Sequence, residues 1–347
     1  MTGKGFFRLS VSTVGLTLIV ILLGAWVRLE DAGLGCPDWP GCYGMLLGVP
    51  QTEQAVQLAN QAYPERPVHI GKAWKEMIHR YAAGILGLVV FAMAIMAVRN
   101  RRDPAQPLRL PLFLGLLIVM QSILGMWTVT WQLKPLVVTL HLLGGMTTIS
   151  LLWWLTIRQG RFLRPPPTSA VAERLRPWVL AVLALVGVQI ALGGWVSTNY
   201  AALACTDFPL CHGRLVPEAD YSEAFVLWRG LGVDYEFGIL DHPARVAIHF
   251  THRIGALIIA AAVLALAIAV WMRLGFQALA GRIAVAMVAL LGVQWLLGIG
   301  NVVYSLPLAM AVAHNGGAAL LLLSVLTLYH TLRPLPAAVA NGVRGSG

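Results

Sequence analysis

Four histidines recur at matched positions in the two halves of this sequence. His79 and His252 each precede an arginine, and His141 and His314 follow 62 residues after them. All four lie in or at the edge of apolar stretches. Ionisable side chains inside a membrane are costly and usually functional, so these histidines require a partner. Two histidines on facing helices of a bundle can bind haem iron axially from opposite sides, and each half supplies one such pair.

The matched histidines belong to an internal duplication. One offset, of 169 residues, relates Trp26, Cys36 and Cys42 to Trp195, Cys205 and Cys211. A second offset, of 173 residues, relates His79-Arg80, Gln121, His141 and Gly144 to His252-Arg253, Gln294, His314 and Gly317. A longer second external loop accounts for the difference between the offsets.

Two other interpretations of these histidines stay open. A single histidine of this kind most often only hydrogen-bonds between helices, but the recurrence in both halves favours ligands. A zinc or copper site is the weaker alternative, because two histidines per half without a nearby carboxylate or thiol on the second histidine's helix leave the coordination incomplete. The remaining loop and helix-end histidines are interpreted as non-catalytic: His69, His212, His242 and His330.

Small and basic residues beside the histidines suit a flat, anionic macrocycle. Gly144 and Gly317 each lie three residues past a histidine, on the same helical face, where they would let a macrocycle approach the backbone. Arg80 and Arg253 directly follow the other two histidines and could pair with haem propionates.

The two halves differ three residues before the first histidine of each pair. Glu76 precedes His79, whereas His249 precedes His252. A carboxylate beside a haem could accept or deliver protons, or stabilise a cation forming on a substrate, and histidine suits that role less well. We therefore assign chemistry to the first half and electron storage or transfer to the second. Two alternatives stay open: Glu76 as an exposed acid at a helix N-terminus, and His249 as a supporting group or alternative ligand.

All four cysteines lie in two loops of one pattern. Cys36-Pro-Asp-Trp-Pro-Gly-Cys42 and Cys205-Thr-Asp-Phe-Pro-Leu-Cys211 are short enough to close on themselves, so two disulfides within the loops are the simplest pairing. Pairing between the halves, or a metal site that uses His212, stays open. A disulfide would mainly order the lid over each site.

Eight apolar stretches must position these residues, each near the ~20 residues that a spanning helix requires. With 58% hydrophobic and 12% charged residues, the 347-residue chain is too apolar for an ordinary water-soluble domain, which predicts an all-α integral membrane protein. The first stretch is too long for a normal signal-peptide core and lacks a cleavage site, so we interpret it as a structural helix. The expected helices cover 9–27, 77–98, 111–131, 136–157, 178–198, 246–271, 283–304 and 308–330.

The basic residues gather on one side of these helices. The N-terminus, the even-numbered connections and the C-terminus carry 15 of the 25 Lys and Arg residues, against Asp103 and Glu173. The positive-inside rule then places both termini in the cytoplasm and both cysteine loops outside, where disulfides persist. The net charge of +10 follows from this distribution, and no nucleic-acid partner is required.

Four helices per half give the two copies one membrane orientation. We therefore expect two tandem, pseudo-symmetric four-helix bundles, related by an axis along the membrane normal. Residues 1–160 form the expected N-terminal, catalytic bundle, and residues 178–347 form the C-terminal bundle. The basic, proline-rich segment 161–177 is expected to be a cytoplasmic linker.

In these residues the chain resembles the haem A synthase family along almost its full length. The resemblance implies that the protein oxidises the methyl group at ring position eight of haem O to a formyl group, through a hydroxymethyl intermediate, for cytochrome oxidase maturation. It implies that His79 and His141 hold the substrate haem, that Glu76 is catalytic, and that His252 and His314 ligate a resident haem B. The implied partners are a haem O supplier (haem O synthase), an electron donor and the lipid of a bacterial inner membrane; a homo-oligomer is left open.

Two rival functions would use the same histidines. A di-haem b-type electron-transfer protein would perform no haem chemistry, and it should carry haems at both membrane depths. The four histidines here are instead expected at similar depth near one side. A haem transporter or chaperone needs only reversible binding and leaves Glu76 without a role.

Overall fold

The computed structural model describes residues 3–104, 106–160 and 170–333. Across these ranges the chain is helical apart from loops and two isolated β-bridges, and eight helices are long and apolar enough to cross a membrane. The all-α, eight-span fold predicted from the sequence is therefore confirmed. The eight helices are α1 (Gly3–Leu29), α3 (Ile70–Arg99), α4 (Arg109–Thr130), α5 (Pro135–Gln159), α6 (Ala170–Thr198), α8 (His242–Leu274), α9 (Leu279–Val303) and α10 (Leu308–Thr331).

Seven of these eight helices begin before the apolar stretches that predicted them, and α10 begins where expected. Helix α3 begins seven residues earlier than expected, α8 four residues earlier and α6 eight residues earlier. Hydropathy marks only the apolar part of a helix, whereas backbone hydrogen bonding continues to the cap. At the start of α3, the His69 side chain accepts a hydrogen bond of 3.3 Å from the Lys72 amide and so fixes the first turn.

The predicted linker is shorter than expected. Its residues 161–169 lie outside the described residues, and the remainder, from Ala170, already belongs to α6, with Pro177 inside that helix. Two further helices, which the sequence did not predict, lie in the connections between α1 and α3 and between α6 and α8. They are the ten-residue α2 (Glu53–Ala62) and the single turn α7 (Tyr221–Ala224).

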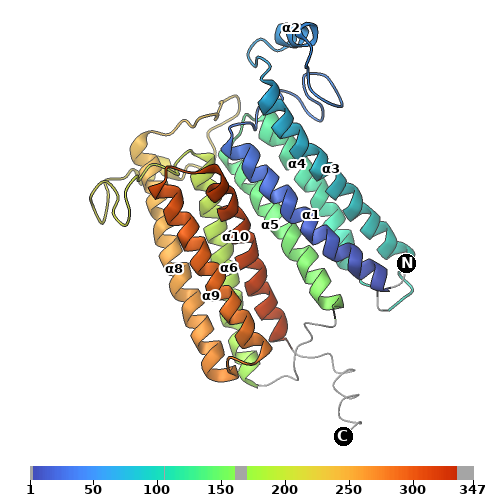
Figure 1. The fold of residues 1–347 in the computed structure, drawn as a ribbon, viewed down its shortest axis with the longest axis vertical. Helices are drawn as coiled ribbons and strands as arrows, with labels where there is room; N and C mark the ends of the chain where they lie inside the picture. Colours follow the sequence, from blue (N-terminus) through green and yellow to red (C-terminus); the bar gives the residue numbers. More distant parts are fainter. Residues whose placement is uncertain (1–2, 105, 161–169, 334–347) are drawn as a thin grey trace.

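The membrane helices pack as two rings of four (Figure 1). In the first ring, α1 and α4 each contact both α3 and α5, so α3 and α5 lie diagonally opposite each other. In the second ring, α6 and α9 each contact both α8 and α10, so α8 and α10 are the diagonal pair. The rings meet along α1, α5, α6 and α10. An axis relating the two rings, and a division of labour between residues 1–160 and 178–347, stay predictions.

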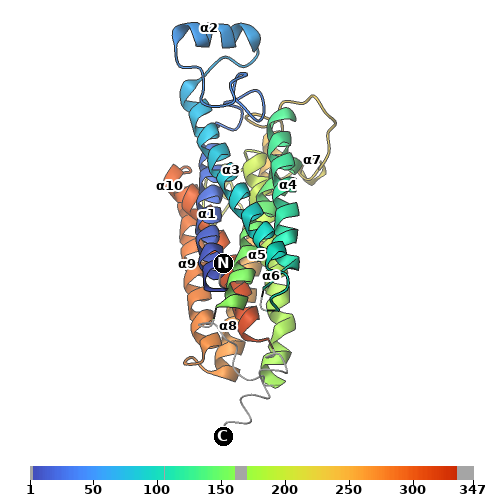
Figure 2. The ribbon, with the colours of Figure 1, turned by 90° about the vertical axis from the view of Figure 1, so that its right-hand side faces the viewer.

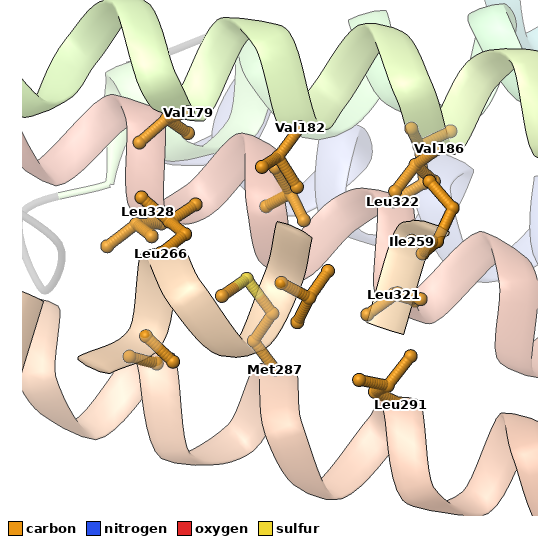
Figure 3. Close-up of a cluster of buried hydrophobic side chains, with 14 of the residues drawn as sticks. Val179, Val182, Val186, Ile259, Leu266, Met287, Leu291, Leu321, Leu322 and Leu328 are labelled. Atoms are coloured by element: carbon orange, nitrogen blue, oxygen red, sulfur yellow. The ribbon is translucent and has the colours of Figure 1, made fainter. Parts of the chain in front are cut away.

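The interior of the second ring is a continuous apolar cluster (Figure 3). It draws residues from all four helices, including Val179, Val182, Leu266, Met287, Leu291, Leu321 and Leu328. Outward-facing residues such as Leu88 and Leu296 are equally apolar and exposed, as expected against lipid. Because lipid tails are as apolar as leucine, close packing and interhelical hydrogen bonds hold such helices together. One of these bonds joins the rings: Trp153 Nε1 on α5 donates to Thr327 Oγ1 on α10 at 2.8 Å.

The two ends of the molecule differ in character. The α1–α3 and α6–α8 connections, with α2 and α7, lie at one end, which we call the cysteine end (Figures 1 and 2). The first described residues of α1 and the last turn of α10 lie at the other, which we call the opposite end. The fold therefore places both cysteine loops above the same ends of the helices.

Candidate functional site

The four histidines predicted as ligands lie on the diagonal helices of the two rings. His79 and His141 are on α3 and α5, and His252 and His314 are on α8 and α10. The two imidazoles of each pair lie near enough for their charges to act on each other. The structure thus brings together the pairs that the sequence grouped. Each pair is carried by diagonally opposite helices, so a flat group held by both imidazoles would lie inside that ring of helices.

Each histidine packs against a glycine on a neighbouring helix. A β-carbon built on that glycine would lie between 3.0 and 3.4 Å from Cε1 of the imidazole. Such a contact is tighter than ordinary van der Waals packing, so a larger residue would displace the imidazole. The glycine–histidine pairs are Gly24–His79, Gly125–His141, Gly193–His252 and Gly298–His314.

The imidazoles fit the role of axial haem ligands. The Nδ1 atoms of His79, His141 and His314 are buried, and the backbone of Val20, Gln121 and Gln294, respectively, lies within reach of these imidazoles. A carbonyl that accepts from Nδ1 leaves Nε2 available for the iron. A haem supplies the equatorial ligands of its iron and requires only two from the protein, which matches one histidine pair per ring. Within the described ranges, no group of three or more His, Cys, Asp or Glu is placed to hold a bare metal ion.

Glutamines occupy the space beside the two glycines that were predicted to admit a macrocycle. The Gln121 side chain lies against Gly144, and the Gln294 side chain lies against Gly317. Gln294 Nε2 also donates to the His314 carbonyl at 2.8 Å. A macrocycle that approaches the backbone at these glycines would have to displace both amides.

Glu76 is buried, with 4% of its surface exposed, and lies two turns inside α3. Its Oε2 accepts a hydrogen bond of 2.9 Å from the Cys36 amide, and its Oε1 pairs with the Arg80 guanidinium. The alternative that Glu76 is an exposed acid at a helix N-terminus is therefore wrong. A carboxylate with a fixed orientation, removed from water and one helical turn from His79, is suited to proton transfer.

His249 takes the place of Glu76 in the second ring. It is buried, its Nδ1 lies 3.3 Å from the Cys205 amide, and its Nε2 lies 3.2 Å from Arg253 Nε. Glu76 makes the corresponding contacts with Cys36 and Arg80. The site thus has one backbone arrangement in both rings, with an acid in the first and an imidazole in the second. Of the two alternatives, the observed contacts are those of a supporting group.

The two arginines beside the histidines bind the cysteine loops. Arg80 Nη1 donates to the carbonyls of Asp38, at 2.9 Å, and of Gly41. Arg253 donates to three loop carbonyls: those of Asp207, Leu210 and Cys205, at 2.8–2.9 Å. These contacts hold each loop against the helix that carries the first histidine of the pair. Propionate binding by the same arginines stays a prediction.

Both disulfides predicted within the loops are present. Cys36–Cys42 and Cys205–Cys211 have S–S distances of 2.04 and 2.03 Å. Each loop ends in a two-residue hairpin closed by paired backbone hydrogen bonds, Cys42 with Met45 and Cys211 with Arg214. The lids over the two sites are therefore built alike.

The aspartate in the middle of each cysteine motif orders that hairpin. Asp38 accepts hydrogen bonds from the amides of Tyr43 and Gly44, at 2.6 and 2.7 Å. Asp207 accepts from the amides of His212 and Gly213, at 2.7 and 2.9 Å. The Gly213 amide in particular holds the pKa of Asp207 below its ordinary value.

Tyr43 extends the network around Glu76 toward the external loops. Its hydroxyl donates to the carbonyls of Arg66, at 3.1 Å, and Pro67, at 3.3 Å. Burial raises the pKa of Tyr43, and the nearby charges of Glu76 and Asp38 raise it further, so the phenol stays protonated. It can therefore serve as a hydrogen-bond donor but not as a base at neutral pH.

A segment of the second external loop crosses to the first ring. We call residues 226–241 the strap; Figure 2 shows this stretch arching beside α4. Its Asp234 and Glu236 pair with Arg66, just before α3, and its Gly230 carbonyl accepts from Lys134, just before α5. The strap is thus fixed at the outer ends of the two helices that carry His79 and His141.

The histidines predicted to be non-catalytic have other surroundings. His69 caps α3, His212 Nε2 lies 2.7 Å from the Ala204 carbonyl beside His242, and His330 packs edge-on against Trp154 at the opposite end. Sequence reasoning missed the role of the motif aspartates and the strap. The recurrence of Asp38 and Asp207 in both motifs was the available signal for the first, but no pattern in the sequence indicated the second.

The chain is similar to known proteins along nearly its whole length. Residues 7–326 match the family described as cytochrome oxidase assembly protein. A haem A synthase of Shewanella oneidensis is 47% identical over 325 residues, which cover 92% of this chain and 94% of that protein. A haem A synthase of Caulobacter vibrioides is 29% identical over 87% of this chain and 89% of its own length. One of Allorhizobium ampelinum is 28% identical over 96% and 93%.

Proposed function

This chain belongs to the cytochrome oxidase assembly protein family, and from that membership we infer that it is a haem A synthase, a multi-pass membrane enzyme that oxidises a haem substrate. The single observation that carries the inference is the 47% identity to a haem A synthase over 92% of the chain. The paired histidines and the buried Glu76 supply groups for such chemistry.

We propose that the substrate is haem O and that its methyl group at ring position eight is oxidised to a formyl group through a hydroxymethyl stage. His79 and His141 would hold the substrate iron between α3 and α5. The fit rests on the burial of both imidazoles, the backbone groups that lie near them and the glycines packed against them.

Glu76 is the proposed catalytic acid–base. Oxidation of a methyl carbon to the formyl level requires an oxygen atom, either from dioxygen, which is then also the oxidant, or from water, in which case the electrons pass to an acceptor. In either case the carbon loses hydrogen, and the Glu76 carboxylate can accept a proton or stabilise positive charge that develops on that carbon. The Cys36 amide and Arg80 hold the carboxylate in one orientation before the substrate arrives. The Cys36–Cys42 loop packs over this carboxylate, which is 4% exposed.

In the second ring, His252 and His314 would hold a resident haem B. That group, when bound, supplies a one-electron carrier next to the catalytic ring. Gln189 Nε2 lies 3.1 Å from His252 Nδ1 and 2.9 Å from its carbonyl, which orients this imidazole. His249 would stabilise the loop without the proton chemistry assigned to Glu76.

The setting of the enzyme follows from the distribution of charge. We propose a bacterial inner membrane location with both termini in the cytoplasm, because the basic residues gather at the opposite end of the helices. A haem O synthase would supply the substrate, and a separate donor would exchange electrons with the second ring. The product would serve haem–copper cytochrome oxidase.

The function is tested by extracting the haems from the purified protein, produced in a host that makes haem O. Wild type is expected to contain haem B together with haem O, its hydroxymethyl form or haem A. Glu76→Gln should retain haem O and lose conversion by a factor of about 10²–10⁴. Glu30→Gln is the matched control. Glu30 directly follows α1 and pairs with Lys75, which lies on the same helix as Glu76, but Glu30 itself lies outside the site. Haem B alone in all three proteins would instead support the di-haem electron-transfer function.

A further inference from the structure

Three arginines gather at the opposite end of the molecule, where the two rings meet. Arg158 lies in the last turn of α5, Arg176 in the early part of α6, and Arg333 just after α10. Arg333 is near enough to the other two for their positive charges to repel one another. We call these residues the arginine cluster.

The cluster has no acidic partner among the described residues. None of the ion pairs found among these residues involves Arg158, Arg176 or Arg333. Like charges held together without a counter-charge are unfavourable, and burial together with its two arginine neighbours lowers the pKa of Arg333. An anion at this place would relieve the repulsion.

A buried donor in the cluster also lacks a partner. Arg176 Nε is inaccessible and makes no hydrogen bond, although one of its Nη atoms lies 3.5 Å from the Tyr329 hydroxyl. An arginine that leaves a buried N–H unsatisfied loses about 1–3 kcal/mol unless an acceptor is supplied. A phosphate oxygen is a suitable acceptor for such a donor.

Aromatic side chains place this cluster at the membrane surface. Arg333 stacks over the Trp154 ring at 5.0 Å, and Arg176 lies 5.7 Å from the centre of the Tyr329 ring. Trp154 and Tyr329 pack against each other at 5.9 Å. Tryptophan and tyrosine at the ends of spanning helices mark the level of the lipid headgroups.

The surface beside the cluster is apolar and open. Trp178, two residues after Arg176, is 66% exposed, and Leu180, Leu185 and Val188 further along α6 are also exposed. Leu180, one helical turn after Arg176, lies on the same face of α6, so an amphiphile with its phosphate at the arginines could lay an acyl chain against it. A free phosphate ion could occupy the arginines but would gain nothing from the apolar surface.

We propose that the arginine cluster, Arg158, Arg176 and Arg333, is a binding site for the headgroup of an anionic phospholipid at the junction of the two rings. Basic pockets between membrane helices recognise such headgroups by charge and hydrogen bonding. Helices α5 and α10 end at this place and α6 begins here. The bound lipid would therefore join the two rings at the end of the molecule opposite the strap.

The test uses the full-length protein in phosphatidylcholine nanodiscs with added phosphatidylglycerol or cardiolipin. Native mass spectrometry measures the lipid that stays bound, and thermal unfolding measures its stabilising effect. Wild type should retain anionic lipid, and its unfolding temperature should rise with that lipid. Replacing all three arginines by glutamine (R158Q/R176Q/R333Q) should weaken binding roughly a hundredfold.

The matched control removes the same charge elsewhere at the same end. Arg99, Arg101 and Arg102 are exposed around the α3–α4 turn, and R99Q/R101Q/R102Q should bind the lipid as wild type does. If the cluster variant does not fold, Arg158→Gln alone changes an exposed position and should still weaken binding about fivefold. Equal losses in both triple variants would overturn the proposal. So would stabilisation by inorganic phosphate or phosphatidylcholine as large as that by phosphatidylglycerol.

Discussion

The Cys36 amide donates a hydrogen bond of 2.9 Å to the Glu76 carboxylate, so the first residue of a disulfide loop and the acid beside the first histidine pair are directly connected. Arg80 completes the arrangement by binding both the carboxylate and the loop carbonyls. A change that increases the mobility of the loop should therefore alter the position of the Glu76 carboxylate more than the positions of the histidines.

Opening the first disulfide should impair conversion more than haem binding. In Cys36→Ser with Cys42→Ser, the loop gains freedom and the Cys36 amide no longer holds Glu76 steadily. A hydrogen bond to a charged group contributes about 1.5–3 kcal/mol, which corresponds to a loss of at least about tenfold in conversion rate. The measurement is the ratio of haem A to haem O in the extracted protein.

The second disulfide gives the control for this effect. Cys205→Ser with Cys211→Ser opens the equivalent loop, whose amide contacts His249 rather than an acid. This variant should show the smaller change in conversion. Equal losses from the two double variants would contradict the link between the first loop and Glu76.

Filling the space beside His79 should reduce haem binding in the first ring. In Gly24→Ala the new β-carbon would lie 3.0 Å from His79 Cε1, so the imidazole must move away from its position. We expect a several-fold lower haem O content with unchanged haem B, measured by pigment extraction. Gly15→Ala on the same helix meets nothing within 4 Å and should behave as wild type.

The second cysteine loop should lose stability in acid through Asp207. The His212 and Gly213 amides favour the ionised carboxylate and lower its pKa, so the stabilisation is fully present above the ordinary aspartate pKa of about 3.9. It is lost as the pH falls through the lowered value. The unfolding temperature of wild type should exceed that of Asp207→Asn at pH 5 to 7, and the difference should disappear in stronger acid.

Asp241, a second aspartate in the connection between α6 and α8, provides the comparison for that pH dependence. Asp241 precedes α8 but makes no capping hydrogen bond through its side chain. Asp241→Asn should therefore leave the unfolding temperature close to that of wild type. A pH dependence of equal size in both variants would show that the Asp207 hairpin is not its source.

Releasing the strap should increase exchange in the loop without unfolding the helices. Asp234→Asn with Glu236→Gln removes both partners of Arg66, and partly exposed ion pairs contribute about 0.2–1 kcal/mol each. Hydrogen–deuterium exchange should rise several-fold across residues 226–238. Glu218→Gln removes the highly exposed partner of Arg214 and should leave exchange in the strap unchanged.

The sequence predicted the helices and the histidine pairs well, because both depend on strong local or repeated signals. Runs of apolar residues identify spanning helices without any tertiary information. Duplication identified His79, His141, His252 and His314 as a set, and the fold places them on diagonal helices. Pairing of the cysteines within each loop was the simplest arrangement for their close spacing, and the structure contains these two disulfides rather than a pairing between the halves.

Contacts between distant residues were less accessible from the sequence. The burial of Glu76 depends on a loop that folds back over α3, and helix position alone could not distinguish this from an exposed acid. The strap depends on charge pairs separated by about 170 residues along the chain. Such pairings have no local pattern, because the fold and not the spacing brings the partners together.

The contrast between Glu76 and His249 has a consequence for why both rings occur in one chain. If a single four-helix unit associated with an identical copy, symmetry would place the same side chain at both positions, and the two sites could not differ. A continuous polypeptide removes that restriction, so one half can carry a carboxylate where the other carries an imidazole. Covalent fusion therefore permits asymmetry between two sites that share one backbone plan.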